Sequence, residues 1–182
     1  VFAVNVTAPY LLIRRVARQM VDRGIAGRIV NVTSSSAHRA RWSIPAYGAS
    51  KAALTQLTRL AAADLGAHGI TVNAVAPGLT ATRMVSDAMD EEQPARVLCE
   101  GPAANLLGRN PQPEDVGDTI PLLCRPASPQ VTGQTILLNS GAAVCEGSAD
   151  YAAALSCQSP ARDATRRRPR PLHTTPSQTR RP

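Results

Sequence analysis

Residues 46–78, AYGASKAALTQLTRLAAADLGAHGITVNAVAPG, contain the pattern that decides the fold. The first part predicts a long helix over residues 46–67, because apolar residues recur at helical spacing on one side: Leu54, Leu57, Leu60, Ala61 and Leu65. Glycines end that helix. The β-branched run over residues 70–75 then predicts a strand, which Pro77 and Gly78 stop.

The start of the chain has helical spacing as well. Residues 1–23 predict a helix with one side formed by Val6, Tyr10, Ile13, Ala17 and Met20. Pro9 lies inside this pattern and has no main-chain N–H group to donate. Either Pro9 kinks the helix, or the regular part of the helix begins near it.

The remaining elements continue the alternation of helices and strands. Residues 28–33 predict a strand, residues 113–123 a helix, and residues 131–138 a turn that leads into a third strand. Strands that alternate with helices imply a parallel sheet covered on both faces. The fold class is therefore α/β, with a doubly wound parallel sheet.

The chain of 182 residues is short enough for one domain, which we expect over residues 1–141. Residues 83–112 lack a firm pattern and are expected to form a substrate lid. Residues 142–182 are a low-complexity tail rich in Arg and Pro, and such a composition predicts disorder.

Composition excludes several classes of protein. The four cysteines are widely spaced, so they indicate neither a disulfide framework nor a zinc site, and no metal is expected. No apolar run approaches the roughly 20 residues that a membrane helix needs. These features favour a reducing, cytoplasmic setting and give no reason to expect a membrane partner.

Tyr47 is followed four residues later by Lys51, the sole lysine of the chain. Residues four apart lie on one face of a helix. A nearby ammonium group favours the phenolate and lowers the pKa of a tyrosine, which is otherwise about 10. The pair can therefore act as a general acid and base near neutral pH. The alternative is that both residues are ordinary surface residues of the helix.

Ser34 ends the first predicted strand, thirteen residues before Tyr47. Pro77 and Gly78 end the next strand. In parallel α/β sheets, ligands bind outside the carboxyl ends of the strands. Three separate elements thus deliver polar groups or tight turns to one edge of the sheet.

The stretches IVNVTSS, AYGASKAALTQLTRLAAADLGAHGITVNAVAPGLTATRM and VTGQTILLNSG together resemble the short-chain dehydrogenase/reductase family. The resemblance extends from residue 1 to about residue 141. It implies a Rossmann-like fold and hydride transfer between NAD or NADP and a carbonyl or secondary alcohol. It also implies that full-length members form homo-oligomers.

The resemblance implies roles for four residues. Tyr47 would exchange a proton with the substrate oxygen, and Lys51 would hold the nicotinamide ribose and lower the pKa of Tyr47. Ser34 would hydrogen-bond the substrate oxygen. Asn5 matches an asparagine that orders a water molecule beside the lysine, although a turn or helix-cap role is the alternative reading of Asn5.

The resemblance also implies a cofactor site, to which Tyr47 and Lys51 belong. Pro77 and Gly78 would let the main chain approach the nicotinamide, and Leu79 would contribute its main chain. Thr82 would bond the carboxamide, with Thr80 as the second candidate. His38 and His68 pair with no nucleophile, so surface positions are expected for both histidines.

One family feature is missing from the sequence. A glycine-rich turn of the TGxxxGxG type, which cradles a pyrophosphate, is not found. We therefore expect the chain to contain only the C-terminal half of the sheet and to expose apolar faces. We also expect that the chain alone neither binds dinucleotide tightly nor catalyses turnover.

Two other functions remain open. A catalytically dead remnant or scaffold would fold without binding a cofactor. A nucleic-acid-binding role would use the basic run at residues 166–170, but that run has no interleaved aromatic residues. The substrate, and the choice between NAD and NADP, cannot be read from these residues.

Overall fold

The structure is a computed structural model of the 182-residue chain and describes residues 1–39, 44–80, 82, 106–107, 109–125 and 130–142. The expected lid lies outside these ranges except for its last residues. The expected tail lies outside them except for Ala142.

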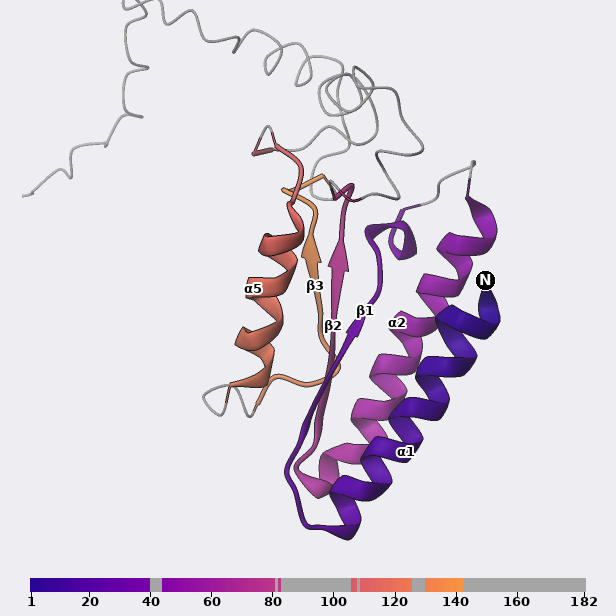
Figure 1. Ribbon diagram of the computed structural model, residues 1–182, viewed down its shortest axis with the longest axis vertical. Coiled ribbons are helices and arrows are strands. Elements are labelled where there is room, and N and C mark those ends of the chain that lie inside the picture. The colour runs from indigo at the N-terminus through magenta and orange to yellow at the C-terminus, as the bar shows by residue number, and fades with distance from the viewer. Residues whose placement is uncertain (40–43, 81, 83–105, 108, 126–129, 143–182) are drawn as a thin grey trace, which may run out of the picture.

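Three parallel strands form the sheet in the order β1 (Arg28–Val32), β2 (Thr71–Pro77) and β3 (Thr135–Leu138). Ile29 is opposite Val72, and Val75 is opposite Ile136. In Figure 1, α1 and α2 lie on one side of this sheet and α5 (Pro113–Cys124) lies on the other. The α/β fold with a parallel sheet covered on both faces is confirmed.

The first helix has two parts. A π-helical turn, η1 (Ala3–Thr7), runs directly into α1 (Ala8–Asp22), with Pro9 in the first turn of α1. The N–H of Ala8 bonds to the carbonyl of Ala3, five residues earlier. Since proline tolerates the first turn of an α-helix, the regular part begins near Pro9, which was one of the two expectations.

The long helix α2 (Pro45–Leu65) continues into a short 3₁₀ turn, η3 (Gly66–His68). Leu54, Ala61 and Ala62 are buried, whereas Leu60 is 55% exposed. The apolar side predicted for this helix is therefore buried only in part. One residue corresponds to about 100° of rotation, so Leu60 cannot share the buried direction of Ala61.

Strand β2 is the centre of the core. Its residues from Thr71 to Ala76 are all buried, and Ile70, Val72 and Val75 are almost completely so. The side chain of Asn73, 1% exposed, holds the segment before β3 with two hydrogen bonds. Its Nδ2 donates to the Val131 oxygen at 2.8 Å, and its Oδ1 accepts from the Gln134 N–H at 3.0 Å. This clamp fixes where β3 begins.

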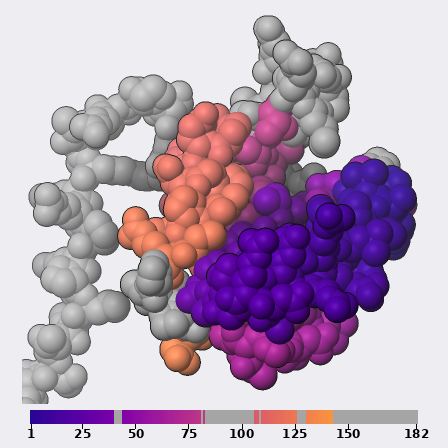
Figure 2. Space-filling view, turned by 60° about the horizontal axis from the view of Figure 1, so that its bottom comes forward, coloured from indigo at the N-terminus to yellow at the C-terminus, as the bar shows by residue number. Residues whose placement is uncertain are grey.

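One side of the molecule leaves apolar side chains uncovered. Val32, at the end of β1, is 46% exposed, and Figure 2 shows the atoms of η1 and α1 at the surface. Exposed apolar residues of η1 and α1 include Val4, Tyr10, Leu11, Leu12 and Val16. The expectation of exposed apolar faces is confirmed, and the exposed residues include Tyr10 from the apolar side predicted for this helix. Within the described ranges, no helix is both long and apolar enough to cross a membrane.

Candidate active site

The site is built where the carboxyl ends of the strands meet the amino end of α2. All three strands run in one direction, so Val32, Pro77 and Leu138 end at the same edge of the sheet. In Figure 1 the first turns of α2 lie beside this edge. The chain therefore brings Ser34, which follows β1, and Tyr47 in α2 to the same region.

Ser34 caps a short 3₁₀ turn, η2 (Ser35–Ala37), and is buried. Its hydroxyl oxygen accepts a hydrogen bond from the N–H of Ser36 at 3.2 Å. This turn packs closely on α2, since a Cβ added at Gly48 would lie 3.2 Å from the main-chain oxygen of Ser36. A glycine next to Tyr47 thus allows the Ser34 turn to approach the first turn of α2.

Tyr47 and Lys51 lie on one face of α2. The Nζ atom of Lys51 is 5.8 Å from the centre of the Tyr47 ring. The same ammonium group donates to the main-chain oxygen of Val32 at 3.1 Å. Burial lowers the pKa of Lys51 below its ordinary value, because a partly dry environment disfavours the charged form.

Asn5 reaches the Tyr47 turn through a residue that the sequence analysis missed. Its Nδ2 donates to the hydroxyl of Ser50 at 3.0 Å, and that hydroxyl donates to the main-chain oxygen of Tyr47 at 2.7 Å. Ser50 is completely buried. A polar residue on the apolar side of a predicted helix, directly before Lys51, was the available signal.

A groove of about 370 Å³ lies between η1, α1, β1 and α2. Asn5 and Lys51 both line it. The other lining residues are Val4, Pro9, Leu12, Ile13, Val16, Arg28, Ile29, Val30, Asn31, Val32 and Leu54. Lys51 and Asn5 thus border the same largely apolar groove.

The expected cofactor segment follows β2. Pro77 is the last residue of that strand, and Gly78 donates from its N–H to the Leu138 oxygen at 2.7 Å. A Cβ on Gly78 would lie 2.9 Å from both Cα and Cβ of Asn139, so packing on β3 already requires glycine here. The Thr80 hydroxyl donates to the Gly78 oxygen at 3.3 Å, whereas Thr82 is exposed.

The structure thus brings together Asn5, Tyr47 and Lys51, with Ser34 at the same edge of the sheet. Within the described part of the chain, no hydrogen bond joins Ser34 to Tyr47. Asn31, the last residue but one of β1, donates from Nδ2 to the Thr58 hydroxyl at 2.9 Å. His38 and His68 are exposed, as expected.

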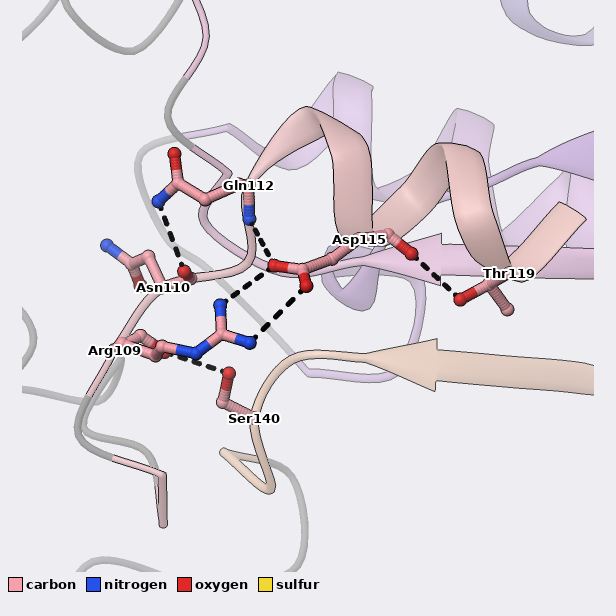
Figure 3. A network of polar contacts seen from close by, with 6 residues as sticks. All are labelled: Arg109, Asn110, Gln112, Asp115, Thr119 and Ser140. Atoms are coloured by element: carbon pink, nitrogen blue, oxygen red, sulfur yellow. Dashed lines mark hydrogen bonds and ion pairs between the residues drawn. The ribbon is translucent and has the colours of Figure 1, made fainter.

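A second polar network lies near the start of α5 (Figure 3). Arg109 grips the Asp115 carboxylate with two bonds, Nη1 to Oδ2 at 2.8 Å and Nη2 to Oδ1 at 3.3 Å. The Gln112 N–H also donates to Asp115 at 2.8 Å. These bonds, led by the one from Arg109, lower the pKa of Asp115 from 3.8 to about 2.

This network borders a mainly apolar cavity of about 370 Å³ beside the end of β3, lined in part by Leu106, Leu137 and Leu138. None of the residues expected in the active site lines that cavity. Across the described ranges, no group of three or more His, Cys, Asp or Glu side chains is placed to hold a metal ion.

Comparison with known proteins gives a consistent picture. The family described as Enoyl-(Acyl carrier protein) reductase matches residues 1–143. The short-chain reductase protein NovJ of Streptomyces niveus is 38% identical over 128 residues, which cover 69% of this chain and 48% of that protein. Carbonyl reductase (NADPH) 2 of Sus scrofa is 34% identical over 140 residues, covering 77% of this chain and 56% of that protein.

Solved structures give the same result. A 4-hydroxyisoleucine dehydrogenase complexed with NADH matches with a TM-score of 0.73 and 29% identity, over 80% of this chain and 59% of that one. The chain therefore spans about half the length of the relatives that it matches.

Proposed function

The chain belongs to the short-chain dehydrogenase/reductase family, and we propose that it carries the proton-transfer and nicotinamide-binding part of an oxidoreductase. The proposed reaction moves a hydride between NAD or NADP and a carbonyl or secondary alcohol. A small-molecule substrate is therefore the expected partner.

One observation carries the proposal. Tyr47 and the only lysine of the chain lie on one face of α2 at the carboxyl edge of a parallel sheet, and the lysine is anchored to the end of β1. A cation beside a phenol favours the phenolate, so the pair suits proton transfer. Ligands of open α/β sheets bind outside this edge.

In the direction of reduction, the Tyr47 hydroxyl gives its proton to the carbonyl oxygen while the carbonyl carbon accepts the hydride. Ser34 donates a hydrogen bond to the same oxygen and orients it. Lys51 stabilises the phenolate that remains on Tyr47, and Asn5 helps to return a proton to it through water. NAD(P)H, when bound, supplies the hydride.

The residues present fit the nicotinamide side of such a cofactor. The Lys51 ammonium and the Tyr47 hydroxyl are donors suited to ribose hydroxyl groups. Pro77, Gly78 and Leu79 offer main-chain groups at the end of β2. Thr82 is exposed, and its hydroxyl suits a carboxamide, whereas the Thr80 hydroxyl is engaged by Gly78.

The proposal for the whole protein extends beyond this chain. The chain spans about half of its relatives, and the described residues offer no glycine-rich phosphate turn. We therefore assign only the nicotinamide side of the cofactor site to it, and we propose that the 182 residues alone bind dinucleotide weakly.

A second candidate is a non-catalytic remnant or scaffold. The observation that favours it is the uncovered apolar face of η1, α1 and the end of β1. Faces of this kind mark contacts with other polypeptide. The third possibility, nucleic-acid binding through residues 166–170, concerns a segment outside the described residues.

Turnover separates these candidates. The chain is combined with the stretch of the Sus scrofa carbonyl reductase that it does not cover, and oxidation of NADH and NADPH is followed with a panel of small carbonyls. Tyr47→Phe should lower kcat by about 10²–10⁴-fold, while exposed Tyr10 provides the matched control Tyr10→Phe. Tyr47→Phe turning over at the unmodified rate would exclude the proposal. Turnover by the chain alone would contradict the proposal that the 182 residues bind dinucleotide only weakly.

A further inference from the structure

Two buried hydroxyl groups on α2 make the same pair of bonds. Ser50 donates to the Tyr47 oxygen at 2.7 Å and accepts from Asn5 at 3.0 Å. Thr58 donates to the Leu54 oxygen at 2.9 Å and accepts from Asn31 Nδ2 at 2.9 Å. Both residues have 0% exposure. We call these the Ser50 clamp and the Thr58 clamp.

The two clamps differ in what they join. The Thr58 clamp ties Asn31, the last residue but one of β1, to Thr58, seven residues beyond Lys51 in α2. The Ser50 clamp ties the π-helical turn η1 to the turn of α2 that carries both Tyr47 and Lys51. The bonding patterns are alike, but only the Ser50 clamp touches the turn with the proposed chemistry.

The bonding of Ser50 fixes the orientation of the Asn5 amide. A hydroxyl has one hydrogen to donate, and Ser50 gives it to Tyr47, so it can meet Asn5 only as an acceptor. The nitrogen branch of the amide must then point to Ser50. The Oδ1 branch makes no hydrogen bond among the described residues, and Asn5 lines the same groove as Lys51.

We propose that Ser50 is a positioning residue for the proposed reaction, because its hydroxyl holds the Asn5 amide and η1 against the turn of α2 that carries Tyr47 and Lys51. The inference rests on the proposed function and adds a residue to it. Ser50 touches neither substrate nor cofactor and acts through Asn5 and through the Tyr47 carbonyl.

Losing the Ser50 hydroxyl has a local consequence. Without the acceptor, Asn5 can rotate and η1 can move away from α2, which exposes the Lys51 ammonium group further to water. Hydration removes the cause of the lowered Lys51 pKa. Losing the Thr58 hydroxyl frees the Asn31 amide, which borders the same groove, but it leaves the bonds between Asn5, Ser50 and the Tyr47 carbonyl in place.

The test uses the full chain labelled with ¹³Cε-lysine, which gives one resonance because Lys51 is the only lysine. Ser50→Ala is compared with Thr58→Ala, the matched control. We expect similar falls in Tm for both. Ser50→Ala should raise the Lys51 titration midpoint, and by more than Thr58→Ala does. It should also weaken the binding of nicotinamide mononucleotide, followed by the chemical shift of Lys51, by about three- to tenfold.

A second variant, Asn5→Leu, removes the donor at a partly exposed position. It should raise the Lys51 midpoint as Ser50→Ala does, and it replaces Ser50→Ala in the test if that variant does not fold. Equal midpoints for Ser50→Ala, Asn5→Leu, Thr58→Ala and the unmodified chain would overturn the inference. If the unmodified chain shows no response to nicotinamide mononucleotide, the proposed function fails, while the midpoints still decide the clamp.

Discussion

Lys51 donates a hydrogen bond from Nζ to the main-chain oxygen of Val32, 3.1 Å away. This bond joins the second turn of α2 to the last residue of β1, two residues before Ser34. The lysine is therefore not a freely solvated surface residue. It is held at the edge of the sheet where Tyr47 lies, which is the arrangement that the proposed proton transfer from Tyr47 requires.

The pKa of Lys51 should lie below that of free lysine. Its partial burial disfavours the ammonium form, so the ¹³Cε resonance should show a midpoint under the ordinary value of about 10.4. Because the folded chain disfavours the charged amine, the unfolding free energy should rise as the pH passes upward through the lowered pKa, and Lys51→Met should remove that rise. A midpoint at or above that of free lysine would contradict this environment.

Gly78→Ala should destabilise the chain by about 1–3 kcal/mol, since the added methyl group meets Asn139 main-chain and side-chain carbons at 2.9 Å. Gly117→Ala in α5 is the matched control, because nothing lies within 4 Å of the new Cβ. There alanine should stabilise by about 0.4–1 kcal/mol. Urea unfolding measures both, and equal effects at the two sites would refute the close packing of Gly78.

Asn73→Ala should lower the free energy of unfolding by about 2–4 kcal/mol, because it removes two buried hydrogen bonds and leaves their partners unpaired. The partners are the Val131 oxygen and the Gln134 N–H. Amide exchange of Gln134 should also accelerate in this variant more than that of residues in β1. Unchanged exchange at Gln134 would show that Asn73 does not hold the segment before β3.

The Arg109–Asp115 pair should make stability depend on acid pH. The folded pKa of Asp115 is about 2. The stabilisation is complete above the ordinary carboxyl pKa of about 3.9 and is lost as the pH falls towards the folded value. The difference in Tm between the unmodified chain and Asp115→Asn should therefore shrink between about pH 4 and pH 2. A difference that grows over that range would contradict the ion pair.

Much of the fold could be predicted because local patterns and tertiary packing agree. The β-branched run before Pro77 is a strand, and Pro9 lies where a helix accepts proline. The exposure of Leu60 could not be predicted, because hydrophobicity alone does not fix which residues of a largely apolar helix are buried. Its neighbour Ala61 takes the buried position.

The candidate site was predictable only in part. Tyr47 and Lys51 are four residues apart, so helical geometry places them together. Spacing marks Ser50 only as a polar residue on the apolar side of the helix, because its bond to Asn5, 45 residues away in sequence, forms only after η1 packs on α2. Gly78 was predicted for closeness to a cofactor, while its packing on Asn139 depends on strand pairing.

The most direct measurement follows the single Lys51 ¹³Cε resonance of the 182-residue chain during titration with nicotinamide mononucleotide and, separately, with adenosine monophosphate. The account predicts that the nicotinamide nucleotide moves the resonance saturably and that the adenine nucleotide at equal concentration does not, since only the nicotinamide side of the cofactor site is assigned to this chain. A resonance that neither nucleotide moves, or that both move equally, would contradict it.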